Sequence, residues 1–229
     1  MKKRIRIQGM FIFLVVLLFI MFARFTIASW KEGPADEFFD IVGILSVLFG
    51  FLLRIVARGH KEETSHGGSR LVINGPYSLM RNPMYFGTLL IGTGVIAILL
   101  RLWTLLIFLI IYFSIYIPQV NKEEKILLER FGEDYKNYCK SVSKYFPNIR
   151  GLSDFKNYIF LLKLSWLKKE LVPLIATITA IFIIEIWQDV KLFGFSEFFD
   201  EILELSLVIL IFTAVIFLLA FRKNNKQHE

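Results

Sequence analysis

The amino-acid sequence predicts an all-α protein: a polytopic bundle of about six transmembrane helices, with a central helical hairpin and a cytoplasmic amphipathic helix. Of its 229 residues, 55% are hydrophobic and 16% are aromatic, which is more apolar than an ordinary soluble domain. The apolar residues gather in runs near the roughly 20 residues that a helix needs to cross a bilayer. Basic residues lie on one side of these runs, as is typical of cytoplasmic loops in membrane proteins.

Four apolar runs each predict one membrane crossing. They hold at most two charged residues each and are Met10 to Ala28, Phe38 to Ala57, Val172 to Trp187 and Ile202 to Phe221. A further stretch from Tyr85 to Ile117 is interrupted only by Arg101 and is too long for one crossing. We interpret it as a helical hairpin that turns at Arg101. A single long buried helix is the alternative, and Gly92 and Gly94 disfavour it because glycine weakens a helix interior.

The distribution of Lys and Arg predicts that both termini are cytoplasmic. Of the 27 basic residues, four precede the first run, five lie between Arg54 and Arg81, eleven lie between Lys122 and Lys169, and three follow Phe221. Acidic residues crowd the opposite side, at 32–40 and 189–201. Six crossings place every basic segment in the cytoplasm, where such residues accumulate. We therefore expect an integral membrane protein of an inner or plasma membrane.

The same features argue against a cleaved leader, a nucleic-acid partner and a metal site. The first apolar run exceeds the roughly 7–15 residues of a signal-peptide core. The net charge of +7 follows the membrane flanks, where anionic lipid headgroups attract it. Cys139 is the only cysteine, and His60, His66 and His228 lack metal-ligand spacing. We expect each histidine to be a solvated loop residue.

Two polar segments flank the predicted hairpin on the cytoplasmic side. The first reads GPYSLMRNPMYFG from Gly75 to Gly87. Its Asn-Pro pair predicts a turn that is followed at once by a helix. Arg81, Asn82 and Tyr85 would then cluster at the cytoplasmic mouth of the third transmembrane helix. The alternative is a capped helix with an interfacial anchor, since Arg and Tyr are common at that depth.

The second polar segment runs from Asn121 to Tyr138 and continues to Pro147. Its apolar residues recur at steps of three or four and predict an amphipathic helix that is bent or broken near Gly132; they are Leu127, Phe131, Tyr135, Tyr138 and Val142. Glu123 and Glu124 emerge where the fourth helix should end, and adjacent carboxylates gain nothing there from the helix dipole. We expect them to approach the first segment and to favour a cationic ligand, the alternative being an interfacial helix with solvated charges.

Together the two segments resemble the membrane-embedded methyltransferases that include isoprenylcysteine carboxyl methyltransferase and phospholipid N-methyltransferases. The resemblance covers Asn74 to Pro147, about a third of the chain. That family usually has Arg-His-Pro where this chain has Arg81-Asn82-Pro83. An amide retains a hydrogen-bond donor but does not titrate, so a mechanism that uses the histidine as a base does not carry over.

The resemblance implies S-adenosylmethionine as cofactor and a lipid or prenylated substrate that enters sideways from the bilayer. Arg81 and Glu124 would be the catalytic residues, Arg81 with Asn82 on the cofactor carboxylate and Glu124 on its ammonium or ribose. Tyr77 and Tyr85 would pack against the sulfonium or the adenine. The remaining residues that the resemblance assigns to cofactor binding are Pro83, Gly87, Glu123, Tyr135 and Tyr138.

Two other functions remain open at this point, along with the division of the chain. Some membrane sterol reductases resemble the same turn and bind NADPH, although the chain has no further dinucleotide motif. A membrane scaffold or carrier without catalysis is the third possibility.

We expect the chain to divide into three parts. Residues 1–73 would form two helices and a loop, residues 74–150 would form the cofactor-binding core, and residues 151–229 would add an amphipathic linker and two helices beside the lipid entrance or an oligomer contact. The sequence does not specify the oligomeric state.

Overall fold

All the regular structure that is described in this protein is helical. The computed structural model describes residues 34–99, 103–148 and 162–193, together with residues 203, 206, 207 and 210. Within these ranges there is no strand. The predicted crossing from Met10 to Ala28 lies outside the described residues, as does the crossing from Ile202 to Phe221 apart from the four single positions.

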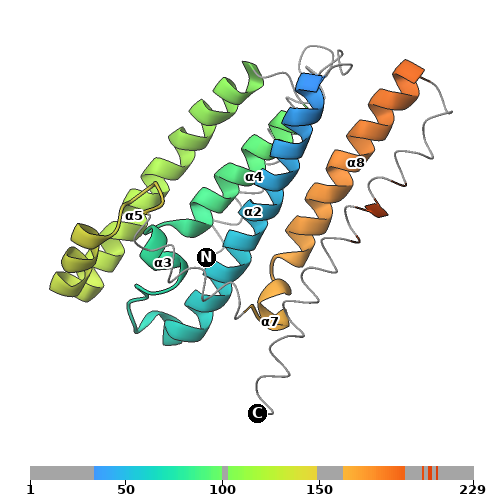
Figure 1. Ribbon diagram of the computed structural model, residues 1–229. Helices are drawn as coiled ribbons and strands as arrows, with labels where there is room; N and C mark the ends of the chain where they lie inside the picture. The colour runs from blue at the N-terminus through green and yellow to red at the C-terminus, as the bar shows by residue number, and fades with distance from the viewer. Residues whose placement is uncertain are drawn as a thin grey trace.

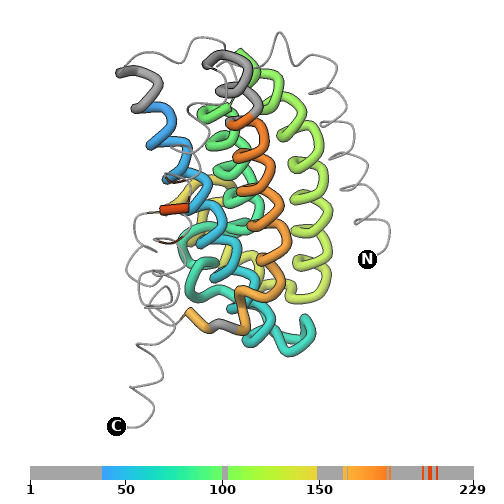
Figure 2. The backbone as a smooth tube through the Cα atoms, turned by 90° about the vertical axis from the view of Figure 1, so that its right-hand side faces the viewer, coloured from blue at the N-terminus to red at the C-terminus, as the bar shows by residue number. Residues whose placement is uncertain are grey.

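Four long helices form the bundle (Figure 1): α2 (Pro34–Thr64), α4 (Pro83–Leu99), α5 (Trp103–Ser141) and α8 (Leu171–Phe193). Three short elements lie at one end of it: η1 (His66–Gly68), α3 (Pro76–Leu79) and α7 (Leu164–Leu167). Helices α2 and α4 pack side by side. Figure 1 shows α5 and α8 at opposite edges of the bundle, and Figure 2 views the bundle from the side of α8.

Glycines allow α2 and α4 to approach closely. A Cβ built on Gly94 would lie 2.5 Å from the backbone oxygen of Gly43, and one built on Gly50 would lie 2.7 Å from that of Gly87. Side chains larger than hydrogen would therefore force the helices apart, as in the small-residue interfaces of membrane helices. Gly87, predicted to bind a cofactor, lies in this seam.

Two apolar clusters join the bundle to its carboxy-terminal part. Val47 and Phe51 of α2 pack with Ile98 of α4 and with Leu174 and Ile181 of α8. A second cluster places Leu162 and Trp166 against α2 and α3. Helix α8 thus packs on the face of α2 and α4 that lies away from α5 (Figure 1).

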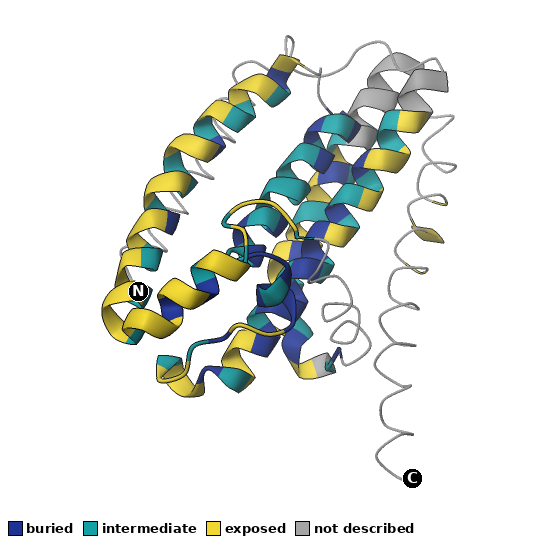
Figure 3. Cartoon of the chain, turned by 60° about the vertical axis from the view of Figure 1, so that its left-hand side comes forward, coloured by how far each residue is buried: buried dark blue, intermediate teal, exposed yellow. Residues whose placement is uncertain are grey.

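Helices α2 and α5 are long and apolar enough to cross a membrane. Only 39% of the apolar window of α2 and 17% of that of α5 is buried inside the protein, whereas the core helix of a soluble protein is mostly buried. Figure 3 shows exposed residues along much of α5, and they include Leu106, Ile110 and Phe113. Exposed apolar helices indicate a protein that contacts lipid.

Helix α2 is longer than the predicted crossing, which corrects two sequence expectations. It continues through Thr64, so Arg58, which lies beyond the predicted crossing, is on a helix. The extension is stabilised by α7, whose Trp166 packs against Gly59. His60 is consequently only 6% exposed, which contradicts its assignment as a solvated loop residue. His66 is exposed, in η1.

The hairpin is present, but its second arm is longer than predicted. Helix α4 ends at Leu99 and α5 begins at Trp103; Arg101 lies outside the described residues. The apolar stretch predicted a second arm that ends near Ile117, whereas α5 continues to Ser141 with Pro118 inside it. The predicted break is found at Gly132, where φ is 52° and ψ is −120°, a conformation that glycine adopts at little cost.

Candidate active site

The turn between α3 and α4 carries the first polar segment. Gly75 has a positive φ of 63°, and Pro76 and Pro83 occupy the first turns of α3 and α4, positions where a missing N–H costs nothing. Both prolines are fully buried. Arg81 and Asn82 are therefore held in a short extended stretch between two rigid helix starts.

Residues 142–148, which we call the strap, cross over this turn. The backbone N–H of Arg81 donates to Ser143 O at 2.9 Å, and that of Asn148 donates to Leu79 O at 2.7 Å. The side-chain amide of Asn82 donates to the backbone oxygen of Lys144 at 3.2 Å. Asn82 thus fastens the strap to the turn, and these three bonds fix the strap beside Arg81.

Glu124 lies between two cations at the same point. Its Oε1 atom is 3.4 Å from Nε of Arg81, and its Oε2 atom is 2.8 Å from Nζ of Lys144. The Arg81 contact has ion-pair distance, yet neither of its two atoms, both buried, makes a well-directed hydrogen bond. The Lys144 contact is the stronger of the two, because its distance of 2.8 Å is that of a charge-assisted hydrogen bond.

Glu123 faces α4 rather than the cations. Its Oε1 atom accepts from the Tyr85 hydroxyl at 2.7 Å and from the Gln119 side chain at 2.9 Å. The hydroxyl of Tyr112 in turn donates to the backbone oxygen of Tyr85 at 2.6 Å. These bonds link the start of α4 to α5 and so help to hold the two arms of the hairpin together.

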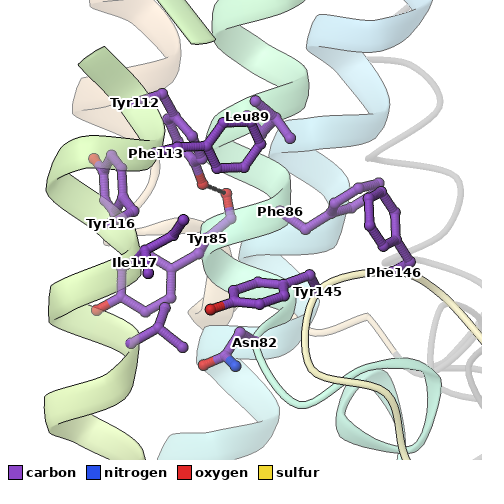
Figure 4. A pocket seen from close by; sticks show the side chains of 11 residues that line it. Asn82, Tyr85, Phe86, Leu89, Tyr112, Phe113, Tyr116, Ile117, Tyr145 and Phe146 are labelled. Carbon is purple, nitrogen blue, oxygen red and sulfur yellow. Dashed lines mark hydrogen bonds between the residues drawn. The ribbon is translucent and has the colours of Figure 1, made fainter. Parts of the chain in front are cut away.

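An apolar groove opens beside these polar groups, between α4, α5 and the strap (Figure 4). It measures about 450 Å³, including its open part. Aromatic rings form much of its wall: Tyr112 and Tyr116 stack with centroids 4.4 Å apart, and Tyr85 meets Tyr116 edge to face. The lining residues are Asn82, Tyr85, Phe86, Leu89, Tyr112, Phe113, Tyr116, Ile117, Val120, Tyr145 and Phe146.

The predicted site residues fall into two groups. Arg81, Asn82 and Glu124 meet beside the strap, and Tyr85 bonds to Glu123. Of these five residues, Asn82 and Tyr85 line the groove. The structure thereby brings together the two segments that flank the hairpin, as expected from their order in the chain.

The second group lies in packing positions. Tyr77 is buried against Ala57 and Val72, and burial, the main cause, raises the pKa of its phenol above its usual range. The Tyr138 hydroxyl donates to the backbone oxygen of Tyr77 at 2.6 Å. Pro83 and Gly87 are buried, and Tyr135 is buried within electrostatic reach of Glu124.

Sequence reasoning missed several residues of this region. Lys144 was counted only as a membrane-flank charge, and no local pattern marks its contact with Glu124. Gln119 lies one helical turn before Glu123 on the same face, so that contact was readable from spacing. Tyr112 and Tyr116 are also four residues apart, a spacing that places both rings on one side of a helix.

A second charged cluster lies on the other side of α4. Glu170 is 0% exposed; its carboxylate is 3.0 Å from Nε of Arg54 and 2.7 Å from a guanidinium nitrogen of Arg58. Arg54 also donates to the hydroxyl of Thr88 on α4. This cluster joins α2, α4 and the start of α8. No local sequence pattern predicts it, because its members are distant in the chain.

The part of the chain that builds the site matches a known family. Residues 39–134 match the family model described as phospholipid methyltransferase. This range contains α4, the Arg81 turn and both glutamates. It ends before the strap and leaves out α8.

Curated relatives agree with this match. The chain is 31% identical over 142 residues to a protein-S-isoprenylcysteine O-methyltransferase of Dictyostelium discoideum, covering 58% of this chain and 60% of that protein. It is 30% identical over 126 residues to the Saccharomyces cerevisiae enzyme of that name, covering 50% and 52%. The human enzyme of that name is 26% identical over 131 residues, with 54% and 46% covered.

The chain thus spans about half to three fifths of the length of these relatives. No solved structure matches it with significance. The family model covers the segment that holds the Arg81 turn, α4 and both glutamates. Through residues 39–134, the chain is similar to the phospholipid methyltransferase family, and over a comparable length it is similar to isoprenylcysteine O-methyltransferases.

Proposed function

We propose that this protein is an integral membrane methyltransferase that uses S-adenosylmethionine and acts on a lipid or a lipidated substrate. The proposal is carried by the contact between Arg81 and Glu124, which adjoins Asn82 at the edge of an apolar groove. A cation and a carboxylate from two distant segments meet there, beside a surface suited to an apolar chain. The names of the curated relatives support the same activity.

The pair formed by Arg81 and Glu124 fits the amino-acid part of the cofactor. Bound S-adenosylmethionine supplies a methyl group made transferable by its sulfonium. Arg81 would hold the cofactor carboxylate and Glu124 its α-ammonium, since charge-assisted bonds are the strong ones. Nε of Arg81 and Oε1 of Glu124 are buried without a well-directed hydrogen bond, and ligand groups would relieve that cost.

The other predicted residues would contribute in two ways. Asn82 and Tyr85 line the groove and would contact the cofactor or the acceptor, with Glu123 orienting the Tyr85 hydroxyl. Tyr77, Pro83, Gly87, Tyr135 and Tyr138 would act mainly by holding the turn and the helix ends in place.

The groove suits an apolar substrate chain. Its lining is mostly apolar with a polar side chain, Asn82, at one edge, and small-molecule sites are likewise mostly apolar with a few polar groups. We favour a carboxylate acceptor, as on a prenylated cysteine, over an amine. A carboxylate is already ionised at neutral pH, and Asn82, which replaces the family histidine, cannot remove a proton. Positioning of an ionised acceptor is then the main catalytic task.

The membrane arrangement completes the proposal. We infer six crossings with both termini and the active site on the cytoplasmic side of an inner or plasma membrane, where a soluble cofactor is available. Residues 74–150 would form the catalytic core, and residues 1–73 and 151–229 would supply the flanking helices. The position of α8, away from the groove, supports a structural or oligomer-contact role for it.

Thermal stability of the purified protein tests the cofactor assignment. A ligand that binds only the folded state raises the apparent melting temperature. S-adenosylhomocysteine should therefore stabilise the wild type, and it should stabilise Arg81→Ala and Glu124→Gln much less. Stabilisation by NADPH but not by S-adenosylhomocysteine would favour a reductase and refute the proposal.

A further inference from the structure

Glu124 is held more firmly by Lys144 than by Arg81. The Nζ atom of Lys144 is 2.8 Å from Oε2 of Glu124 and 2.6 Å from the side-chain oxygen of Asn121. Both acceptors belong to α5, one helical turn apart in the chain, whereas Lys144 belongs to the strap. The Lys144 ammonium thus donates to a carboxylate oxygen and to an amide oxygen. Its side chain is only 24% exposed.

The α-ammonium of S-adenosylmethionine has the same charge and the same three donors as a lysine Nζ. Lys144 occupies Oε2 of Glu124 and Arg81 lies beside Oε1, so an α-ammonium that binds this carboxylate adds a third cation, and like charges repel each other. We propose, on the basis of the function proposed above, that Lys144 is an internal competitor that the α-ammonium of the cofactor must displace from Glu124.

The strap allows this displacement without unfolding. Its anchors to the turn are backbone and Asn82 hydrogen bonds, which do not involve the Lys144 ammonium. Nζ of Lys144 lies 5.3 Å from the centroid of the Tyr145 ring, a distance at which a cation is attracted to an aromatic face. A small rotation of the side chain would exchange the Glu124 contact for the ring, which lies at the groove (Figure 4).

Binding of S-adenosylhomocysteine by calorimetry tests this role, because this product retains the α-ammonium. Lys144→Met keeps the length of the side chain and removes its charge. The variant should bind with a Kd about tenfold below that of the wild type, which corresponds to a gain of about 1.4 kcal/mol. Lys140→Met is the matched control: Lys140 is exposed and its ammonium donates to the side chain of Asn137, so this variant should bind S-adenosylhomocysteine with the Kd of the wild type.

A second ligand separates competition for Glu124 from a general effect of charge. An S-adenosylhomocysteine analogue that lacks the α-amino group does not require Lys144 to move, so its Kd should be the same for the wild type and Lys144→Met. Tighter binding of both ligands by Lys144→Met would refute the proposal. An unchanged Kd of S-adenosylhomocysteine in this variant would also refute it. A higher Kd would refute it as well and would indicate that Lys144 is itself a ligand of the cofactor.

Asn121→Ala provides a second variant if Lys144→Met does not fold. It removes one acceptor of the Lys144 ammonium and should also lower the Kd of S-adenosylhomocysteine, by a smaller factor. An unchanged or higher Kd in this variant would count against the proposal. Absence of S-adenosylhomocysteine binding to the wild type and to all variants would instead refute the proposed function itself, and with it the role of Lys144.

Discussion

Nε of Arg54 on α2 lies 3.0 Å from Oε2 of Glu170, which is completely buried at the start of α8. Arg58 pairs with the same carboxylate at 2.7 Å. Removing one partner of a buried ion pair leaves an uncompensated charge and costs about 3–5 kcal/mol. Glu170→Gln should therefore lower the apparent melting temperature by on the order of 10 °C.

An exposed ion pair of the same two segments gives the control. Lys169 and Glu62 are half or more exposed and form an ion pair 2.6 Å long. Exposed pairs contribute about 0–1 kcal/mol, so Glu62→Gln should change the melting temperature by no more than about 2 °C. An equal drop in melting temperature for Glu62→Gln and Glu170→Gln would show that burial of Glu170 does not determine its contribution to stability.

Substitution of Gly94 tests the close approach of α2 and α4. The added Cβ of Gly94→Ala would lie 2.5 Å from the backbone oxygen of Gly43, and overpacking of this kind costs typically about 1–3 kcal/mol. Gly92→Ala, on the same helix, gains the same helix propensity but meets the end of the Phe108 side chain, which can rotate. Gly94→Ala should melt several degrees below Gly92→Ala; the reverse order would contradict the glycine seam.

Tyr138→Phe tests the link between the α5 extension and the α3 turn. The variant loses the buried hydrogen bond from the hydroxyl to the Tyr77 carbonyl and leaves that carbonyl unpaired, a loss of about 1–3 kcal/mol in the free energy of unfolding. Tyr145→Phe is the control, because this ring belongs to the strap and is partly exposed. It should change the free energy of unfolding by less than about 0.5 kcal/mol. Equal stability of Tyr138→Phe and the wild type would mean that the bond does not stabilise the turn.

Filling the groove separates acceptor binding from cofactor binding. Leu89 lines the groove, so Leu89→Trp should raise the KM for a long-chain acceptor about tenfold, a loss of about 1.4 kcal/mol. The Kd of S-adenosylhomocysteine should change less than twofold. Ile107→Trp, on an exposed part of α5, should change neither value. An unchanged acceptor KM in Leu89→Trp would exclude the groove as the acceptor site.

Some of this structure was predictable because the forces that specify it are local. The break at Gly132 follows from a glycine within an amphipathic pattern, and the hairpin follows from an apolar stretch that exceeds the bilayer thickness. The meeting of Arg81 with Glu124 was also expected, because the two segments flank the hairpin and so return to the same membrane face.

The rest depends on contacts between residues that are distant in the sequence. Helix α2 continues past its apolar run because Arg54 and Arg58 are neutralised by Glu170, which no pattern around them reveals. His60 is buried because α7 covers that end of α2, where Trp166 packs against Gly59. Lys144 reaches Glu124 only because Gly132 redirects the chain after α5 passes the site.

Transfer of a labelled methyl group is the most direct test of the proposed activity. Purified protein would be incubated with methyl-labelled S-adenosylmethionine and either a total membrane lipid extract or a prenylated cysteine peptide, with mass spectrometry of the product. The wild type should label one of these acceptors, and Glu124→Gln should reduce the rate about 100-fold or more, a loss of about 2.7 kcal/mol or more in transition-state stabilisation. Full activity in both Glu124→Gln and Arg81→Ala would contradict the assigned site, and no labelled product from the wild type with any acceptor would contradict the activity.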